Sequence, residues 1–298
     1  RLGLIEEIEA HLHPQAQLRV IEFLQKEALE NSYQIVVTTH SPNLASKIAM
    51  ENLIICTVDG QAFSMGPGNT KLDDDKDDYK FLRRFLDVTK ANMFFARGII
   101  LVEGYAEAIL IPVIAEAMGK SLTKNGVSVV NVGSAAFLRF AKIFLRNDGK
   151  SMPINVSIIT DYDFRPKEYS NAINRDKRRI GLIEDAFDQH EIDSKLKSRS
   201  IEAQKVKTFF SPKWTLEYCL ALSNNVQKHL YSAVLSAWAE KKRAAGTKST
   251  KAIDKMIENQ DSAFDKWGES NEIIAFKIYK ETVLDRQLSK AAIAHYLA

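Results

Sequence analysis

Residues 99–107 read Ile-Ile-Leu-Val-Glu-Gly-Tyr-Ala-Glu, and this stretch decides how the sequence folds. Four apolar residues, three of them β-branched, are typical of a buried strand, and the run stops at an acid followed by glycine. Glu107 comes four residues after Glu103, so both carboxylates can lie on one face of the first turn of a helix. The stretch therefore predicts a strand, a turn and a helix, with two acids where the strand ends.

The same kind of unit recurs twice further along the chain. Val127–Val132 is an apolar run followed by a helical pattern over residues 135–145, and Val156–Thr160 is a third run that ends at Asp161-Tyr162-Asp163. Strands that alternate with helices favour a parallel sheet with right-handed crossovers. We therefore expect an α/β fold, followed by mostly helical chain after residue 164 that is interrupted at residues 209–220.

The four acids of these units should meet. Because parallel strands end at the same edge of a sheet, we expect Glu103, Glu107, Asp161 and Asp163 to lie together there. Carboxylates that gather at one edge repel each other unless a cation neutralises them. Mg²⁺ or Mn²⁺ prefers such oxygen ligands, and two ions can activate a water and stabilise the leaving oxygen of a phosphodiester. Surface acids brought together by chance are the alternative.

A second pair of acids follows the first apolar run, Leu4-Ile5-Glu6-Glu7, and His40 follows the β-branched run of residues 34–38. In nucleotide hydrolases one acid of such a pair holds magnesium and the next polarises the attacking water. We expect Glu6 and Glu7 to serve a nucleotide, with His40 near its terminal phosphate. A metal site at His11 and His13, or a structural His40, are the alternatives. A hairpin around Asp59-Gly60 and a helix over residues 79–92 are predicted next.

The composition narrows the class of protein. The 298 residues are 45% hydrophobic and 27% charged, as in a globular protein, and no apolar run is long enough to span a membrane. We expect Cys56 and Cys219 to be reduced core cysteines in a cytoplasmic protein. The net charge of +3 is too balanced to indicate nucleic acid by itself. The basic runs 175–179 and 241–243 could hold phosphates or be solvated helix faces.

With the residues Glu-Ala-His-Leu-His-Pro at positions 9–14, the N-terminal acids and His40 resemble the Walker B, D-loop and switch-histidine elements of ABC-type ATPases. By that resemblance Glu6 is the metal-side acid, Glu7 the catalytic base and His40 the switch. The sequence has no Gly-rich phosphate loop with its Lys-Ser/Thr. We therefore expect residues 1–69 to be the C-terminal portion of such an ATPase within a longer protein, unable to hydrolyse ATP alone.

The ordered set Glu103-Gly104-X-X-Glu107, Gly133-Ser134 and Asp161-X-Asp163 resembles the Toprim pattern. Behind an ABC-type portion it is similar to the overcoming-lysogenisation-defect (OLD) family of nucleases, which includes the nuclease subunit of Gabija anti-phage systems. The resemblance implies a Toprim domain with helical insertions over residues 97–298, joined to the ATPase portion by a connecting helix over residues 70–96.

The resemblance also implies roles for three further residues. Glu217, in the run Trp-Thr-Leu-Glu at positions 214–217, and Ser134 become additional metal ligands, and Lys290 becomes the lysine that stabilises charge in the transition state. Ser134 as a helix N-cap and Lys290 as an ordinary surface lysine are the alternatives.

The function expected from these patterns is metal-dependent DNA cleavage, with Mg²⁺ or Mn²⁺ as the cofactor and ATP bound by the longer protein. Expected partners are DNA, a second copy of the chain and a helicase-type protein as in Gabija, and the expected role is defence against phage. Two other classes compete: a nucleotide-sensing dimerisation scaffold, and a Toprim topoisomerase or primase acting in DNA repair. A topoisomerase needs a tyrosine nucleophile on a separate domain, and a primase needs a zinc module that the sequence lacks.

Overall fold

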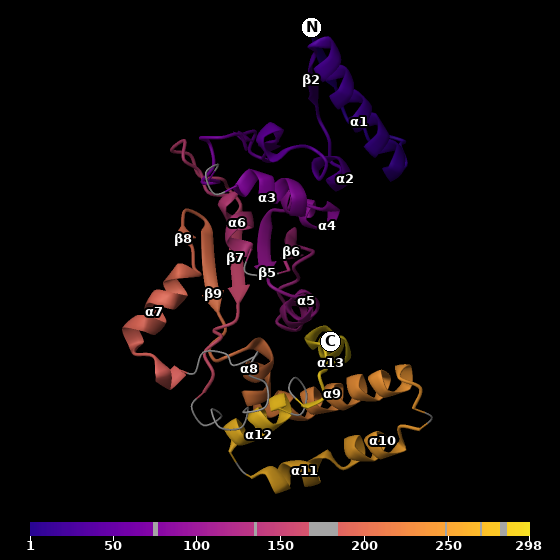
Figure 1. Cartoon of the computed structure of the whole chain (residues 1–298), viewed down its shortest axis with the longest axis vertical. Helices are drawn as coiled ribbons and strands as arrows, with labels where there is room; N and C mark the ends of the chain where they lie inside the picture. The colour runs from indigo at the N-terminus through magenta and orange to yellow at the C-terminus, as the bar shows by residue number, and fades with distance from the viewer. Residues whose placement is uncertain (74–76, 134–135, 167–183, 248, 269, 281–284) are drawn as a thin grey trace.

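The computed structural model describes residues 1–73, 77–133, 136–166, 184–247, 249–268, 270–280 and 285–298. Three parts follow one another along the long axis of the molecule (Figure 1). They are an N-terminal strand–helix unit, a five-stranded sheet with its flanking helices, and a layer of helices that includes the C-terminus. Within the described residues, no helix has the length and apolarity needed to cross a bilayer.

The N-terminal unit is β1 (Leu2–Ile5), α1 (Pro14–Asn31) and β2 (Gln34–Val37), with β1 and β2 paired in parallel. His13 caps α1, because its Nδ1 accepts a hydrogen bond from the Gln15 amide at 3.3 Å, and Pro14 opens the first turn. A short helix, α2 (Pro42–Ala45), follows. The expected strand–helix–strand order is present, and it brings the ends of β1 and β2 side by side.

A hairpin and two short helices connect this unit to the sheet. The hairpin is β3 (Ile54–Cys56) and β4 (Ala62–Ser64), preceded by the 3-10 turn η1 (Met50–Asn52), and it turns at the predicted Gly60. The helix expected over residues 79–92 is wrong as a single element. It is divided into α3 (Asp78–Phe85) and α4 (Val88–Ala91), followed by η2 (Asn92–Phe95). The division falls at Asp87, whose side chain accepts from the Lys90 amide at 3.0 Å and so starts a new helix.

The sheet has the strand order β6–β5–β7–β9–β8. Its strands are β5 (Gly98–Val102), β6 (Val127–Asn131), β7 (Asn155–Thr160), β8 (Glu202–Ala203) and β9 (Val206–Phe210). β5, β6, β7 and β9 are parallel, and β8 pairs antiparallel with β9 at the edge. The predicted parallel sheet is therefore confirmed, with its first three strands at the expected apolar runs.

Helices connect the strands as the sequence predicts. α5 (Tyr105–Ala117) joins β5 to β6, and α6 (Phe137–Lys142) lies between β6 and β7. Because β6 is on one side of β5 and β7 is on the other, the direction of strand addition reverses between β5 and β7. Open parallel sheets bind ligands at such a reversal, beyond the carboxyl ends of the strands.

β9 corrects the expectation of helical chain near residue 206. The strand alternates a buried Val206 with an exposed Lys207, and it pairs with β7 over its whole length. It is reached through the 3-10 turn η5 (Glu184–Ala186) and α7 (Gln189–Ser198), which begins with a capping box between Asp188 and Glu191.

One apolar core joins the hairpin, the connecting helices and the sheet. It includes Phe63 and Met65 from the hairpin region, Leu82 from α3 and Ile158 from β7, all with no exposed surface. A buried carboxylate, Asp78 at the start of α3, adds a polar link: Lys142 and Arg139 of α6 approach it at 2.9 Å and 3.2 Å.

The remaining helices form a separate layer with its own core, below the sheet in Figure 1. They are α8 (Leu216–Leu222), α9 (Asn224–Ala244), α10 (Lys251–Glu258), α11 (Gln260–Trp267), α12 (Asn271–Tyr279) and α13 (Lys290–Leu297). α13 packs between α5 and α9, so the last helix of the chain lies against the first helix of the sheet domain. Cys219 is half-buried and Cys56 exposed, and both thiols are free, so neither is the core residue expected.

Candidate active site

Three strand ends bring acidic side chains to one edge of the sheet. β5 ends directly before Glu103, β7 ends directly before Asp161, and the chain after β9 enters α8, whose first turn carries Glu217. Glu107 lies in the first turn of α5 and Asp163 two residues beyond Asp161. The structure thus places the five carboxylates named from the sequence around one region.

Arg199 links the first group of carboxylates. Its Nη1 lies 2.8 Å from Oδ2 of Asp163, and its Nη2 lies 3.5 Å from Oε1 of Glu103 and 3.0 Å from Oγ1 of Thr160. The Thr160 hydroxyl in turn donates to the same Glu103 oxygen. Arg199 is the C-cap of α7, and no sequence pattern singled it out.

Lys290 links the second group. Its Nζ lies 2.8 Å from Oε2 of Glu217 and 3.2 Å from Oδ2 of Asp161. The other Asp161 oxygen accepts from the Leu216 amide at 2.9 Å, which ties the end of β7 to the start of α8. Lys290 is the first residue of α13, which is capped by Ser289. The late lysine suggested by the resemblance is therefore beside the carboxylates, brought there by the packing of α13 on α5.

Burial raises the pKa of three of the carboxyls, Glu103, Glu107 and Asp163, despite hydrogen bonds and cations that act in the other direction. Burial alone would lower the pKa of Lys290, but Glu217 and Asp161 hold it above its usual range. The site thus contains three carboxyls whose ionisation burial disfavours, and an ammonium group that stays charged.

Asp163 also has an unusual backbone. Its φ of +65° lies in the left-handed region, which aspartate tolerates better than most residues, and its amide donates to the Trp214 carbonyl at 2.8 Å. The same Trp214 packs its ring against Tyr279, with centroids 4.3 Å apart. Burial raises the pKa of Tyr279 to about 12, so this phenol stays protonated beside Lys290. Both rings of this aromatic pair are buried in the core of the helical layer.

The donor chemistry fits a hard divalent cation. Oε2 of Glu107 and Oε1 of Glu217 are buried without a hydrogen-bond partner, and such oxygens need a proton or a cation. Among the described residues, however, no three Asp, Glu, His or Cys side chains are grouped closely enough to hold an ion as they stand. The reason is visible in the contacts: Arg199 lies between Glu103 and Asp163, and Lys290 lies between Asp161 and Glu217.

The N-terminal residues form a separate, exposed group. Nε2 of His40 lies 3.8 Å from Oε1 of Glu7, and the Glu7 amide donates to Thr38 at 3.2 Å. Glu6 is exposed and next to them in sequence. The residue that sequence analysis missed is Glu9, which accepts from the Thr39 hydroxyl at 2.7 Å and from the His40 amide at 2.5 Å.

Partial burial opposes ionisation of Glu9, but these two hydrogen bonds hold its pKa below the usual range. Glu9 therefore fixes the His40 backbone beside the end of β1.

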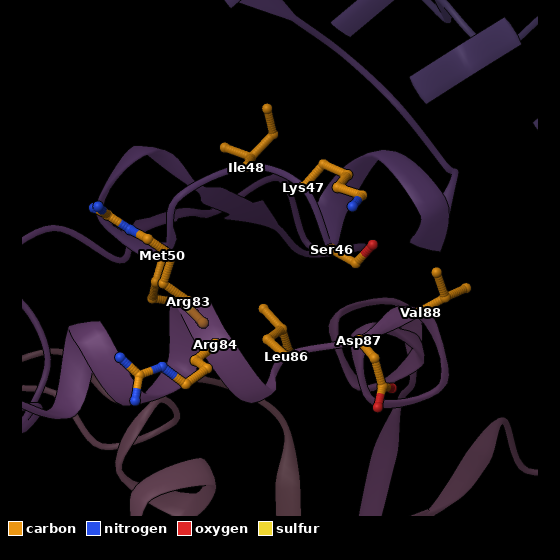
Figure 2. A pocket seen from close by; sticks show the side chains of 9 residues that line it. All are labelled: Ser46, Lys47, Ile48, Met50, Arg83, Arg84, Leu86, Asp87 and Val88. Carbon is orange, nitrogen blue, oxygen red and sulfur yellow. The ribbon is translucent and has the colours of Figure 1, made fainter. Parts of the chain in front are cut away.

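A cavity of about 340 Å³ lies away from both groups, between the segment after α2 and the α3–α4 junction (Figure 2). Lys47, Arg83 and Arg84 are among its lining residues, but it contains none of the candidate site residues. Arg83 already pairs with Glu51. The carboxylate site lies elsewhere, at the carboxyl ends of the sheet strands.

Two sequence-based expectations fall outside the described residues: Ser134, and the basic run 175–179. The second basic run is engaged within the protein. Lys241 donates to the carbonyls of Arg286 and Gln287, both at 2.9 Å, and Arg243 donates to Thr250 at 3.0 Å. Those two cations therefore stabilise the helical layer.

Comparison with known proteins gives two family matches. A model described as "Overcoming lysogenization defect protein-like, TOPRIM domain" matches residues 94–163, and an AAA ATPase domain model matches residues 2–45. The OLD nuclease of Thermus scotoductus is 28% identical over 138 residues, which is 45% of this chain and 26% of that protein. The Septu protein PtuA of Bacillus thuringiensis is 43% identical over 61 residues, which is 20% of this chain and 15% of that protein. The matches span about a quarter or less of these relatives.

Two solved structures are also similar. The C-terminal region of the Burkholderia pseudomallei OLD protein aligns with 68% of this chain and 87% of its own length, at 21% identity and a TM-score of 0.34. The C-terminal region of the Xanthomonas campestris pv. campestris OLD protein aligns with 69% and 84%, at 19% identity and a TM-score of 0.33. Because these TM-scores are low, the assignment to a family rests on the sequence matches alone.

The parallel sheet with acids at its carboxyl edge, together with the match over residues 94–163, defines a Toprim domain that follows an ATPase-type segment. Both elements are those of the OLD family, and the resemblance to that family is confirmed. The boundaries at residues 69 and 96 stay predictions.

Proposed function

We propose that this chain carries the nuclease centre of an OLD-type protein and hydrolyses DNA phosphodiesters with a divalent metal ion. The observation that supports this most is the meeting of five carboxylates and Lys290 at one sheet edge, from elements as far apart in sequence as β5 and α13. A merely structural ion pair would need two charges, whereas this site keeps buried carboxylate oxygens without partners.

In this proposal Glu103, Glu107, Asp161, Asp163 and Glu217 hold the metal, and Ser134 is a further ligand. When bound there, Mg²⁺ or Mn²⁺ would polarise the phosphodiester and lower the pKa of the attacking water. Such a metal relieves the cost of ionising carboxyls that burial makes reluctant to lose their protons.

The chain's own residues then have distinct tasks. The Leu216 amide orients Asp161 through its second oxygen, and Lys290 supplies a positive charge at the same place, where it can donate to a phosphate oxygen that gains charge in the transition state. Tyr162 donates to Glu184, away from the metal-binding oxygens, which disfavours a topoisomerase role for it.

The wider setting of the enzyme belongs to the same proposal. Glu6, Glu7 and His40 would complete an ATP site in the longer protein, and ATP would regulate cleavage. The role that we propose for it is defence against phage, with DNA repair as the alternative. We also propose that the protein forms a homodimer and is cytoplasmic. A helicase-type protein, such as the one in Gabija, is its proposed partner.

The test is cleavage of supercoiled plasmid by the 298-residue chain with Mg²⁺ or Mn²⁺, beside Asp161→Asn and Glu217→Gln variants. We expect nicked or linear product from the parent only, with EDTA abolishing it. Lys124→Ala, at an exposed lysine, is the matched control and should cut as the parent does. Cleavage that persists in both carboxylate variants, or that ignores EDTA, would refute the assignment.

A further inference from the structure

Arg199 is the least expected member of the site, and its contacts divide the carboxylates into two sets. Its guanidinium reaches Asp163 through Nη1 and both Glu103 and Thr160 through Nη2. The side chain is 26% exposed, so most of it lies within the protein. It comes from the end of α7, in the segment between β7 and β8, and not from any of the strands that carry the acids.

The position of the guanidinium is one that a divalent cation needs. Glu103 and Asp163 offer hard oxygen ligands, but one oxygen of each, Oε1 of Glu103 and Oδ2 of Asp163, already faces Arg199. An ion bound by both carboxylates would either displace this guanidinium or lie next to a positive charge, and each costs binding free energy. Without any cation, the two carboxylates would repel each other at the sheet edge.

We propose that Arg199 is an internal counter-ion of the site, which holds Glu103 and Asp163 in the metal-free protein and competes with the divalent ion for them. The inference rests on the proposed metal-dependent function and adds to it a positioning residue that sets metal affinity. Binding of the ion is then an exchange in which the guanidinium leaves the carboxylates as the metal arrives. The protein gains a stable metal-free state at the expense of affinity.

The planar shape of arginine is part of the argument. One guanidinium contacts Asp163 with one nitrogen and the Thr160–Glu103 pair with another, and a lysine ammonium cannot place two donors on such a fork. Arg199→Lys should therefore keep the charge but hold the carboxylates less firmly. Its effects are expected to fall between those of the parent and those of Arg199→Ala.

The experiment is Mn²⁺ titration by calorimetry on the 298-residue chain, with Arg199→Ala, Arg199→Lys and the control Lys197→Ala. Lys197 is exposed and lies two residues before Arg199, so Lys197→Ala removes the same charge from the same end of α7. We expect Arg199→Ala to lower the Mn²⁺ dissociation constant about tenfold, which is ~1.4 kcal/mol. Lys197→Ala should change it less than about twofold, because a solvated charge is screened by salt.

Thermal unfolding gives a second readout that needs no cleavage. In EDTA, Arg199→Ala should unfold at a lower temperature than Lys197→Ala, and Mn²⁺ should raise its unfolding temperature by more. Equal or weaker Mn²⁺ binding in Arg199→Ala, or no binding in any variant, overturns the counter-ion role. A parent that cuts DNA while Arg199→Ala binds Mn²⁺ no tighter overturns this inference alone. If the predicted changes in Mn²⁺ binding are observed but the chain does not cut DNA, only the nuclease proposal is overturned.

Discussion

Replacing Lys290 by methionine should destabilise the metal-free protein, because it leaves Glu217 buried without its cation. Glu217 is 7% exposed and Lys290 is 34% exposed, and their charged atoms are 2.8 Å apart. At an effective dielectric constant of about 20, the attraction of such a pair is roughly 6 kcal/mol. Desolvation and the one-third exposure of the lysine offset more than half of this, so we expect a loss of about 2 kcal/mol.

For a chain of this size, that loss corresponds to a fall in the unfolding temperature of about 3 °C. The assay is thermal unfolding in EDTA, followed by circular dichroism, of Lys290→Met, Glu217→Gln and the double variant. Because the double variant no longer buries the Glu217 charge, it should be more stable than Lys290→Met by about 1 kcal/mol or more. Lys266→Met, at an exposed lysine of α11, controls for loss of a surface charge.

Two results would refute this reasoning. If Lys290→Met unfolds with the parent, the ion pair contributes nothing to stability. If Glu217→Gln adds a further loss to Lys290→Met, the buried carboxylate is not what the lysine neutralises.

Three other expectations can be measured directly. Asp78→Asn should lower the free energy of unfolding by about 2 kcal/mol, since it removes the charge that two cations of α6 surround; denaturant titration checks this, and an unchanged midpoint would contradict it. Gly104→Ala should weaken Mn²⁺ binding while leaving the unfolding temperature within about 2 °C, because the added Cβ would lie 2.9 Å from Oε2 of Glu107, a movable side-chain atom; calorimetry beside thermal unfolding separates the two effects. The folded-state pKa values of Glu103, Glu107 and Asp163 are raised, so the stability that their protonated forms contribute is full at low pH and is lost as pH rises through those values. The metal-free protein should therefore be more stable at mildly acid than at neutral pH, and Mn²⁺ binding should release protons. Calorimetry in buffers of different ionisation enthalpy measures that release, and a release of no protons at mildly acid pH would contradict the expectation.

The sequence predicts β5, β6 and β7 well because each coincides with an apolar, mostly β-branched run that has an acid or glycine at its end. It fails at β9, whose five residues alternate in burial within charged surroundings and resemble part of a helix or loop. Pairing with β7 decides that segment, and pairing is a long-range property that no local window contains.

The same distinction applies to the site. Glu103, Glu107, Asp161 and Asp163 come from motifs whose spacing alone places them at one edge. Arg199 comes from a charged segment in which many residues look alike, and only its contacts with Thr160 and Asp163 at the end of β7 distinguish it. Lys290 lies more than a hundred residues from the nearest strand acid, and its position depends on α13 packing against α5. Family resemblance supplied that residue, and local pattern could not.

The core shared by the hairpin and the sheet has a consequence for how such proteins can be recombined. Phe63, Met65 and Leu82 are wholly enclosed by the same core as the sheet strands. A protein truncated to begin at Gly98 would lose these side chains and expose the apolar surface of the sheet to water. A cut in the short stretch before Pro42 crosses far less of that core. A chimera that exchanges the ATPase segment should therefore have its junction before the hairpin, so that the hairpin stays with the nuclease domain.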